Sequence, residues 1–183
     1  MNRFITTECC IMGLHIVERL PIEDSRGFLE RIYCKDSLGP LIGNKSIRQI
    51  NHTLTKRMGT IRGLHFQYPP DMELKIITCT RGSVWDVVVD MRRNSPTFLN
   101  NYAIRLAQDN NRSIIVPEGC AHGFQTLTTN CEMLYLHTAD HVASSEGSIN
   151  ALDPRLAISW KDLALYRSKR DVGGPMLEDG FNG

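Results

Sequence analysis

The sequence lacks a long hydrophobic run, an excess of charge of either sign and any CxxC pair of cysteines. Its 183 residues include 21 Lys or Arg and 20 Asp or Glu, so the formal net charge is only +1. Nucleic-acid-binding domains usually carry a clear basic excess, and a membrane helix needs roughly 20 consecutive apolar residues. We therefore expect a protein that binds neither nucleic acid nor a membrane.

The chain also lacks the features of a secreted protein. Glu8 and His15 interrupt the apolar residues near its start, which argues against a signal peptide. An even number of cysteines can form a disulfide framework, but such frameworks belong mainly to short secreted chains. We expect free thiols and a cytoplasmic location. The cysteines are Cys9, Cys10, Cys34, Cys79, Cys120 and Cys131.

The middle of the chain has no long helical stripe, but it has many short runs of β-branched and aromatic residues. Turn residues such as Asn, Asp, Gly and Pro separate these runs. We predict one all-β domain over 1–183, an antiparallel sandwich or barrel with a few short peripheral helices, around which a C-terminal segment, 161–183, wraps. The predicted strands are residues 74–80, 83–90, 101–106, 113–116, 123–127 and 132–138.

Charged residues interrupt two of these hydrophobic runs. If Arg81 and Gly82 form a two-residue hairpin loop, the pairing register places Lys75 diagonal to Asp86 on one face. One interpretation is a weak ion pair on an exposed face of the sheet. The other is a polar barrel interior that holds a ligand, and the pattern favours neither.

Two segments place a histidine beside glycines: GTIRGLHFQ at 59–67 and PEGCAHGF at 117–124. The second fits the Pro-x-Gly-x-x-His motif of the cupin superfamily, and this resemblance implies a cupin-like jelly roll. In metal-binding cupins the first motif supplies further histidines and a glutamate, whereas this chain offers His65, Gln67 and Glu73. A metal site normally needs at least three firm protein ligands, so we predict no metal and no cofactor. A metal-dependent cupin oxygenase or isomerase is the alternative.

Five further motifs occur in the order and near the spacing of one epimerase family. They are DSRGFLE at 24–30, QIN at 49–51, RGSVWDVVVDMRRNSPTF at 81–98, EMLYLHTAD at 132–140 and SKRD at 168–171. With the two histidine segments and Lys75, they give a match that spans roughly residues 21–171, most of the chain. On these residues the chain resembles the dTDP-4-dehydrorhamnose 3,5-epimerase family. The resemblance implies epimerisation at C3, C5 or both of a nucleotide-linked 4-keto-6-deoxy sugar, in deoxysugar or surface-polysaccharide biosynthesis.

Epimerisation beside a ketone needs a base, a group that stabilises the enolate, and an acid on the opposite face. A neutral histidine suits the base near pH 7, and the resemblance gives His65 this role, with Asp171 as the carboxylate that orients it. It also implies that Lys75 stabilises the enolate and that Tyr135 is the acid. Without the resemblance, core packing is the ordinary interpretation of His65 and Tyr135, and a solvated charge that of Asp171.

The resemblance further implies a nucleotide-sugar site built by two subunits. Arg62 and His122 correspond to contacts with the diphosphate and the sugar. Arg26 and Glu30 correspond to residues that reach the site from the neighbouring subunit, which implies a homodimer with shared sites and with exchanged strands in 1–50. The alternative is a weak ion pair on an edge strand. The other predicted substrate contacts are Gln49, Asn51, His141, Glu146 and Arg170.

One departure from the family pattern lies near the expected substrate. Six residues after Tyr135 the family commonly has an aromatic residue, whereas this chain has His141. The difference leaves open a single C3- or C5-epimerase that acts on a CDP- or GDP-linked sugar. A sugar-binding cupin without activity is the non-enzymatic alternative, which the presence of both base and acid residues disfavours.

Overall fold

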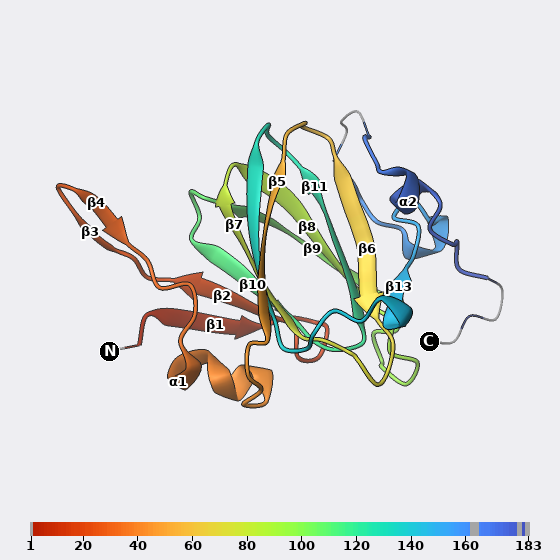
Figure 1. The fold of residues 1–183 in the computed structure, drawn as a ribbon, viewed down its shortest axis with the longest axis horizontal. Coiled ribbons are helices and arrows are strands. Elements are labelled where there is room, and N and C mark those ends of the chain that lie inside the picture. Colours follow the sequence, from red (N-terminus) through yellow and green to blue (C-terminus); the bar gives the residue numbers. More distant parts are fainter. Residues whose placement is uncertain (1, 162–164, 179–180, 182–183) are drawn as a thin grey trace.

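Two antiparallel β-sheets lie face to face in the computed structural model, which describes residues 2–161, 165–178 and 181 (Figure 1). The predicted all-β antiparallel architecture is confirmed. The six-stranded sheet has the order β1 (Phe4–Glu8), β2 (His15–Arg19), β10 (Arg112–Val116), β7 (Lys75–Arg81), β12 (Cys131–His137) and β5 (Gln49–Thr55). The five-stranded sheet has the order β13 (Glu146–Ser148), β6 (Ile61–Gln67), β11 (Cys120–Thr126), β8 (Ser83–Asp90) and β9 (Asn101–Ala107).

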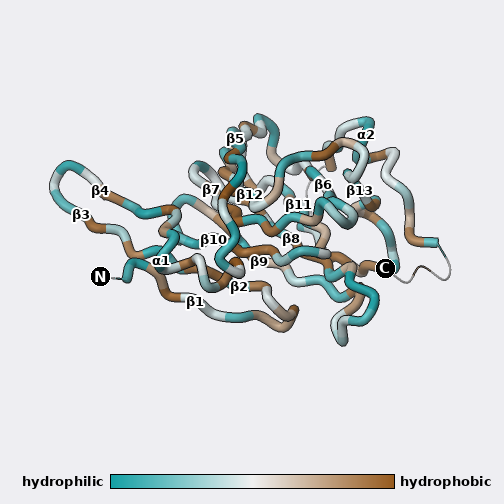
Figure 2. Tube along the Cα trace, turned by 60° about the horizontal axis from the view of Figure 1, so that its bottom comes forward, coloured by the Kyte–Doolittle hydropathy of each residue, from teal (hydrophilic) through white to brown (hydrophobic). Residues whose placement is uncertain are grey.

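The other elements lie at the periphery. Strands β3 (Ile22–Asp24) and β4 (Gly27–Leu29) form an arm that projects from both sheets, with a hydrophilic tip (Figures 1 and 2). Helix α1 (Lys35–Leu38) continues into a 3-10 helix, Gly39–Ile42. None of the described helices is long and apolar enough to span a membrane. The remaining helical turns are Ala143–Ser145, Pro154–Leu156 and α2 (Lys169–Val172).

The alternation of side chains along a strand explains why the central strands are hydrophobic on both faces. In β7, Ile77 belongs to the core between the sheets, while Ile76 belongs to an outer cluster with Leu38 of α1. In β8, Val88 points into the same core, while Val87 packs in a cluster covered by the C-terminal part of the chain. Each fully buried aliphatic side chain contributes about 1.5–3 kcal/mol, so these outer clusters hold α1 and the C-terminal part against the sheets.

The prediction of a hairpin between β7 and β8 was wrong. Strand β7 pairs with β10 and β12, whereas β8 pairs with β9 and β11, so the chain crosses between the sheets at Gly82. Gly82 has φ +76°, and a Cβ at this residue would lie 2.6 Å from Thr128 Oγ1, so glycine is required at the crossing. Both are interior strands with a partner on each edge within their own sheet, so they do not pair with each other.

All six predicted strands are present, with ends within three residues of the expected ones. In the C-terminal segment, α2 matches the expected short helix, and Tyr166 forms a bridge to Thr60 before β6. Residues 162–164, 179–180 and 182–183 of this segment lie outside the described residues. All six cysteines are free thiols.

Candidate active site

A pocket of about 740 Å³ lies between the two sheets. Lys75 and Asp86, the charges that interrupt the hydrophobic runs, are both buried, so the interpretation that placed them on an exposed face was wrong. Of the thirteen predicted site residues, eleven line the pocket, and Arg26 and Glu30 do not. The eleven are His65, Asp171, Tyr135, Lys75, Arg62, His122, Gln49, Asn51, His141, Glu146 and Arg170.

Close packing of β6 against β11 places two histidines side by side. His65 on β6 is directly opposite His122 on β11 in the ladder. Gly63 has φ +122°, and a Cβ there would lie 2.6 Å from the Cα of Gly123. A larger residue at Gly63 would force the two strands apart. The glycines of the two histidine segments therefore fix the distance between the histidines.

His65 is paired with the carboxylate of Asp171. Its Nε2 lies 2.8 Å from Asp171 Oδ1, and the Ser168 hydroxyl donates to the other carboxylate oxygen at 2.8 Å. Burial raises the pKa of Asp171, but the hydrogen bonds from His65 and Ser168 outweigh it and hold the pKa below its usual value. The ionised carboxylate accepts the Nε2 proton, which leaves the lone pair on Nδ1. The His65 side chain is 32% exposed, so this nitrogen is accessible as a base.

His122 has the same kind of partner in a more enclosed place. Its Nε2 lies 2.8 Å from Asp86 Oδ2, and the two side chains are only 6% and 0% exposed. Asp86 belongs to β8, an interior strand, so this histidine is held from within the sheet. The second pair is therefore better suited to a fixed polar contact than to proton exchange with water.

Tyr135 lies on the facing sheet, across the pocket from both histidines. Its ring centroid is 6.3 Å from that of His122. Burial raises the pKa of Tyr135, and the negative charge of Asp86 raises it further. The phenol therefore keeps its proton at neutral pH and can donate it to a ligand between the sheets.

Lys75 lies in the same pocket but is not paired with Asp86, so the predicted diagonal position of the two residues on one sheet was wrong. Its Nζ lies 2.9 Å from Glu73 Oε1 and donates to the carbonyl oxygen of His65 at 3.4 Å. The reason is the crossing at Gly82, which places Asp86 in the other sheet. A buried ammonium close to the histidine can stabilise negative charge that develops on a ligand.

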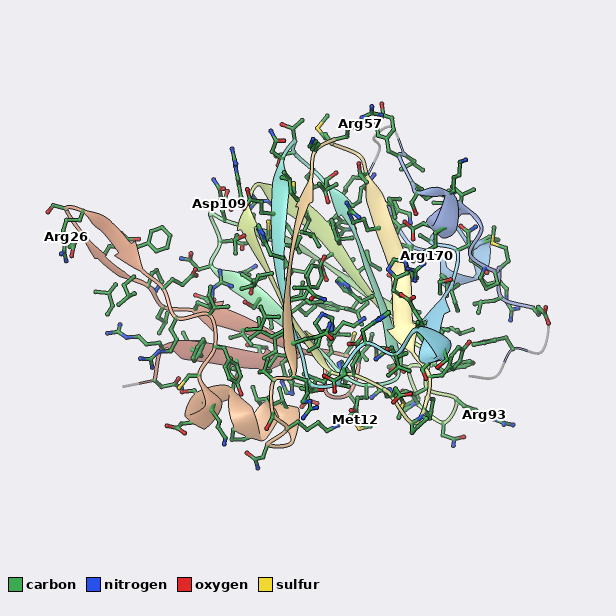
Figure 3. All side chains as sticks on the ribbon, in the orientation of Figure 1. Met12, Arg26, Arg57, Arg93, Asp109 and Arg170 are labelled. Carbon is green, nitrogen blue, oxygen red and sulfur yellow. The ribbon has the colours of Figure 1, made fainter. Side chains whose placement is uncertain are left out.

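Three segments meet at the more exposed side of the pocket. Glu146 on β13 pairs with Arg170 of α2, and its Oε2 lies 3.6 Å from His141 Nε2; Figure 3 labels Arg170 beside β6. The His141 backbone N–H donates to Gln49 Oε1 at 3.1 Å. The position that departs from the family pattern thus carries a titratable ring beside a carboxylate.

Two predicted residues do not reach the pocket of their own chain. Arg26 lies at the tip of the arm, where its side chain is 87% exposed and pairs with Asp24 at 2.6 Å (Figure 3). Glu30 pairs with the buried Arg19. Within one chain each of the two residues therefore forms an ion pair with another partner, and the pair at Arg26 is a weak, exposed one.

Seven lining residues were not predicted as substrate contacts. Thr53 and His137 could have been found from strand alternation, because they lie two residues from Asn51 and Tyr135. Among the described residues, no group of three or more His, Cys, Asp or Glu side chains could hold a metal ion. The seven are Thr53, Phe66, Gln67, Glu73, Phe124, His137 and Ser168.

An imidazole paired with a carboxylate, a protonated phenol and an ammonium share one pocket between the two sheets of a cupin-like fold, an arrangement able to transfer protons on a small ligand. The family model described as dTDP-4-dehydrorhamnose 3,5-epimerase matches residues 8–179. The chain therefore belongs to this family and is an isomerase. Members of the family epimerise nucleotide-linked 4-keto-6-deoxy sugars in deoxysugar biosynthesis.

Individual relatives agree with the family. The dTDP-4-dehydrorhamnose 3,5-epimerase of Salmonella typhimurium is 38% identical over 95% of this chain and 96% of its own. A crystal structure of the same enzyme from Bacillus anthracis has a TM-score of 0.91 and 34% identity, covering 95% and 99% of the two chains. The dTDP-4-dehydrorhamnose 3-epimerase of Streptomyces niveus is 34% identical over 85% of this chain and 75% of its own.

Proposed function

We propose that this chain epimerises a dTDP-linked 4-keto-6-deoxy sugar at both C3 and C5. The observation that carries the proposal is the position of His65 and Tyr135 on facing sheets, with Lys75 in the same pocket. A base and an acid on opposite sides of a ligand are what inversion at carbon requires. The names of the Salmonella and Bacillus relatives support the dTDP sugar and the two carbons.

The proposed reaction is a proton transfer without net oxidation. Nδ1 of His65 takes the proton from a carbon beside the ketone, and the electron pair of that C–H bond forms the enolate. Lys75 donates a hydrogen bond to the C4 oxygen, where the negative charge accumulates. Tyr135 then gives its proton to the carbon from the opposite face, which inverts the configuration. Both groups return to their starting states by exchange with water.

The polar residues around this centre suit a nucleotide diphosphate. Arg62 donates its Nε proton to Thr55 Oγ1 at 2.9 Å, so its terminal nitrogens are the ones available to phosphate oxygens. We propose that Arg62 and His122 contact the diphosphate and the sugar. Gln49, Asn51, His141, Glu146 and Arg170 complete the proposed set of contacts.

Proton NMR in deuterated water with dTDP-4-keto-6-deoxyglucose tests the proposal. Deuterium at both C3 and C5 is the expected result. Deuterium at one carbon only would make the chain a single epimerase, the activity named for the Streptomyces niveus relative. No exchange with the dTDP, CDP or GDP sugar would contradict an epimerase and favour a binding protein.

We also infer a homodimer in which the arm of each subunit completes the site of its partner. Arg26 lies on this arm together with the exposed side chains of Ile22, Phe28 and Leu29, of which Leu29 is 71% exposed. Grouped exposed hydrophobic side chains are typical of an interaction surface. Contact with a second copy would bury them and bring Arg26 towards the partner's pocket.

Two arm variants separate assembly from substrate contact. Phe28→Ser should give a monomer in sedimentation velocity and lose activity. Arg26→Ala should remain dimeric and show a higher KM, because only a phosphate or nucleotide contact is lost. A fully active monomeric wild type would contradict the shared site. The cytoplasmic location remains a prediction from the sequence.

A further inference from the structure

Glu73, Lys75 and His137 form a buried cluster beside the proposed ketone site. Glu73 Oε1 lies 2.9 Å from Lys75 Nζ, and Glu73 Oε2 lies 2.6 Å from His137 Nδ1. The three side chains are only 9–10% exposed. One carboxylate thus connects the ammonium to an imidazole, and neither Glu73 nor His137 has a role in the mechanism above.

The fold holds these groups in place from two neighbouring strands. Lys75 is directly opposite His137 in the ladder between β7 and β12. Glu73 precedes Lys75 by two residues and so lies on the same side of the chain. Leu74 and Thr138 tie the two segments together, because the Leu74 N–H donates to Thr138 Oγ1 at 3.0 Å and the Thr138 N–H donates to the Leu74 carbonyl at 3.1 Å.

The hydrogen bonds assign the protons within the cluster. Burial raises the pKa of Glu73, but the hydrogen bond from His137 and the charge of Lys75 outweigh it and hold the pKa below its usual value. Glu73 is therefore ionised and accepts a proton from His137 Nδ1. A neutral His137 then has its lone pair on Nε2, which lies 3.3 Å from the side-chain nitrogen Nδ2 of Asn51. Both nitrogens of the imidazole therefore have a hydrogen-bond partner.

The contacts of Lys75 leave one direction open. An ammonium has three N–H donors. One is directed at Glu73 and a second at the carbonyl oxygen of His65, at 3.4 Å. No contact among the described residues uses the third, so this donor remains for a ligand in the pocket.

We propose that Glu73 and His137 are positioning residues that aim the free N–H of Lys75 at the ketone oxygen of the substrate. The proposal rests on the epimerase function proposed above. Glu73 fixes the ammonium, and His137 fixes Glu73. A misplacement of about 1 Å can cost about 100-fold in rate. The contact of Glu73 with His137 prevents such a movement of the carboxylate and of Lys75, so its loss should have a measurable effect on kcat.

Several other ionisable groups line the same pocket as Lys75 and must be held constant in a test. They are Tyr135 on β12, His65 and Arg62 on β6, His122 on β11, Glu146 on β13, Asp171 and Arg170 of α2, and His141. A matched control lies outside the pocket on the same sheet. Glu132 also contacts a histidine and a cation, His52 at 3.1 Å and Arg81 at 3.3 Å, but there the histidine and the arginine are exposed. Glu132→Gln therefore removes the same charge from the same type of cluster, away from the ligand.

The kinetic test compares Glu73→Gln with Glu132→Gln. Glu73→Gln should lower kcat by about 10–100-fold and leave KM within twofold, because the lost interaction acts in the transition state. The alkaline limb of its kcat–pH profile should move to lower pH, since a buried ammonium without a counter-ion loses its proton more readily. Glu132→Gln should match the wild type in all three quantities. Equal behaviour of the two variants would overturn the proposal.

A second pair of variants tests His137 by rescue. His137→Leu removes the donor to Glu73 and should lower kcat several-fold. His137→Asn restores an N–H close to the position of Nδ1 and should recover most of the loss. Equal kcat values for the two variants would contradict a positioning role for the imidazole.

NMR of the ligand-free protein keeps the proposal testable if a variant fails to fold or if no sugar is turned over. In the wild type, nitrogen-15 shifts should show His137 protonated at Nδ1, and a proton at Nε2 alone would overturn the cluster. The Cε carbon of Lys75 should titrate at lower pH in Glu73→Gln than in Glu132→Gln. A positive NMR result with an inactive wild type would refute the proposed function and leave the cluster intact.

Discussion

His65 and His122 are direct neighbours in one ladder and each contacts an aspartate at 2.8 Å, yet their surroundings differ. The His65 side chain is 32% exposed and that of His122 only 6%. Asp171 comes from α2 near the end of the chain, whereas Asp86 comes from the central strand β8. One pair faces the open part of the pocket, and the other is enclosed at its buried side.

The difference shows that an aspartate partner alone does not make a histidine a base. A base must exchange its proton with water between turnovers, which needs an accessible nitrogen. An enclosed histidine is held more rigidly and is suited to a fixed hydrogen bond to the ligand. On this ground we give His65 the proton transfer and His122 a binding contact.

The largest effect is expected from His65→Asn. Loss of the base should lower kcat by about 10³-fold, within the range of general acid–base contributions. Binding of dTDP, measured by calorimetry, should change less than twofold because the pocket keeps its other contacts. Retention of more than a tenth of the wild-type kcat would show that His65 is not the base.

Asp171→Asn should have the next largest effect. An asparagine amide can donate to Nε2, which would move the lone pair away from Nδ1 and leave the wrong tautomer facing the substrate. We expect kcat to fall by about 10²-fold with KM little changed. A wild-type kcat in this variant would mean that the pairing of His65 with Asp171 has no role in catalysis.

His122→Asn should be milder and of a different kind. Loss of a binding contact should raise KM and lower kcat/KM by about 10-fold, the effect of a single hydrogen bond of about 1.4 kcal/mol. Steady-state kinetics with dTDP-4-keto-6-deoxyglucose distinguishes the two outcomes. If kcat falls as far as in His65→Asn, the distinction between the two histidines is wrong.

The smallest expected effect concerns stability in acid. The pKa of Asp171 is lowered in the folded protein, despite the opposing effect of burial. Its ionisation therefore stabilises the fold above the usual aspartate pKa of about 4, and this stabilisation is lost as the pH falls through the lowered value. The free energy of unfolding in urea should fall less steeply below pH 4 in Asp171→Asn than in the wild type. Identical slopes would contradict the pKa direction.

Local pattern was sufficient for the strands but not for their partners. The runs at 74–80 and 83–90 are strands as expected, because β-branched composition and turn residues are local properties. A glycine at position 82 suits the sharp turn of a hairpin as well as a crossing between two sheets. Which of the two forms depends on β10, β11 and β12, which are distant in sequence, so the sequence spacing could not show whether Lys75 and Asp86 are neighbours.

The site was predicted to the extent that its residues lie in family motifs. His65, Tyr135 and Asp171 come from three separate motifs, and the fold brings them to one pocket. Glu73 belongs to no motif that identified the family, and His137 lies in the motif at 132–140 without a predicted role; their contact depends on the register between β7 and β12. Arg26 is a different case, because it is predicted to reach the site of a second subunit.

The most direct test of the two-sided mechanism is Tyr135→Phe in deuterated water. His65 should still remove the proton and return deuterium to the same face, because its side chain remains accessible to solvent. We expect deuterium in recovered dTDP-4-keto-6-deoxyglucose without inversion, while the amount of epimerised product falls by about 10²-fold or more. Equal loss of exchange and inversion, or inversion at the wild-type rate, would contradict the assignment of base and acid to facing sheets.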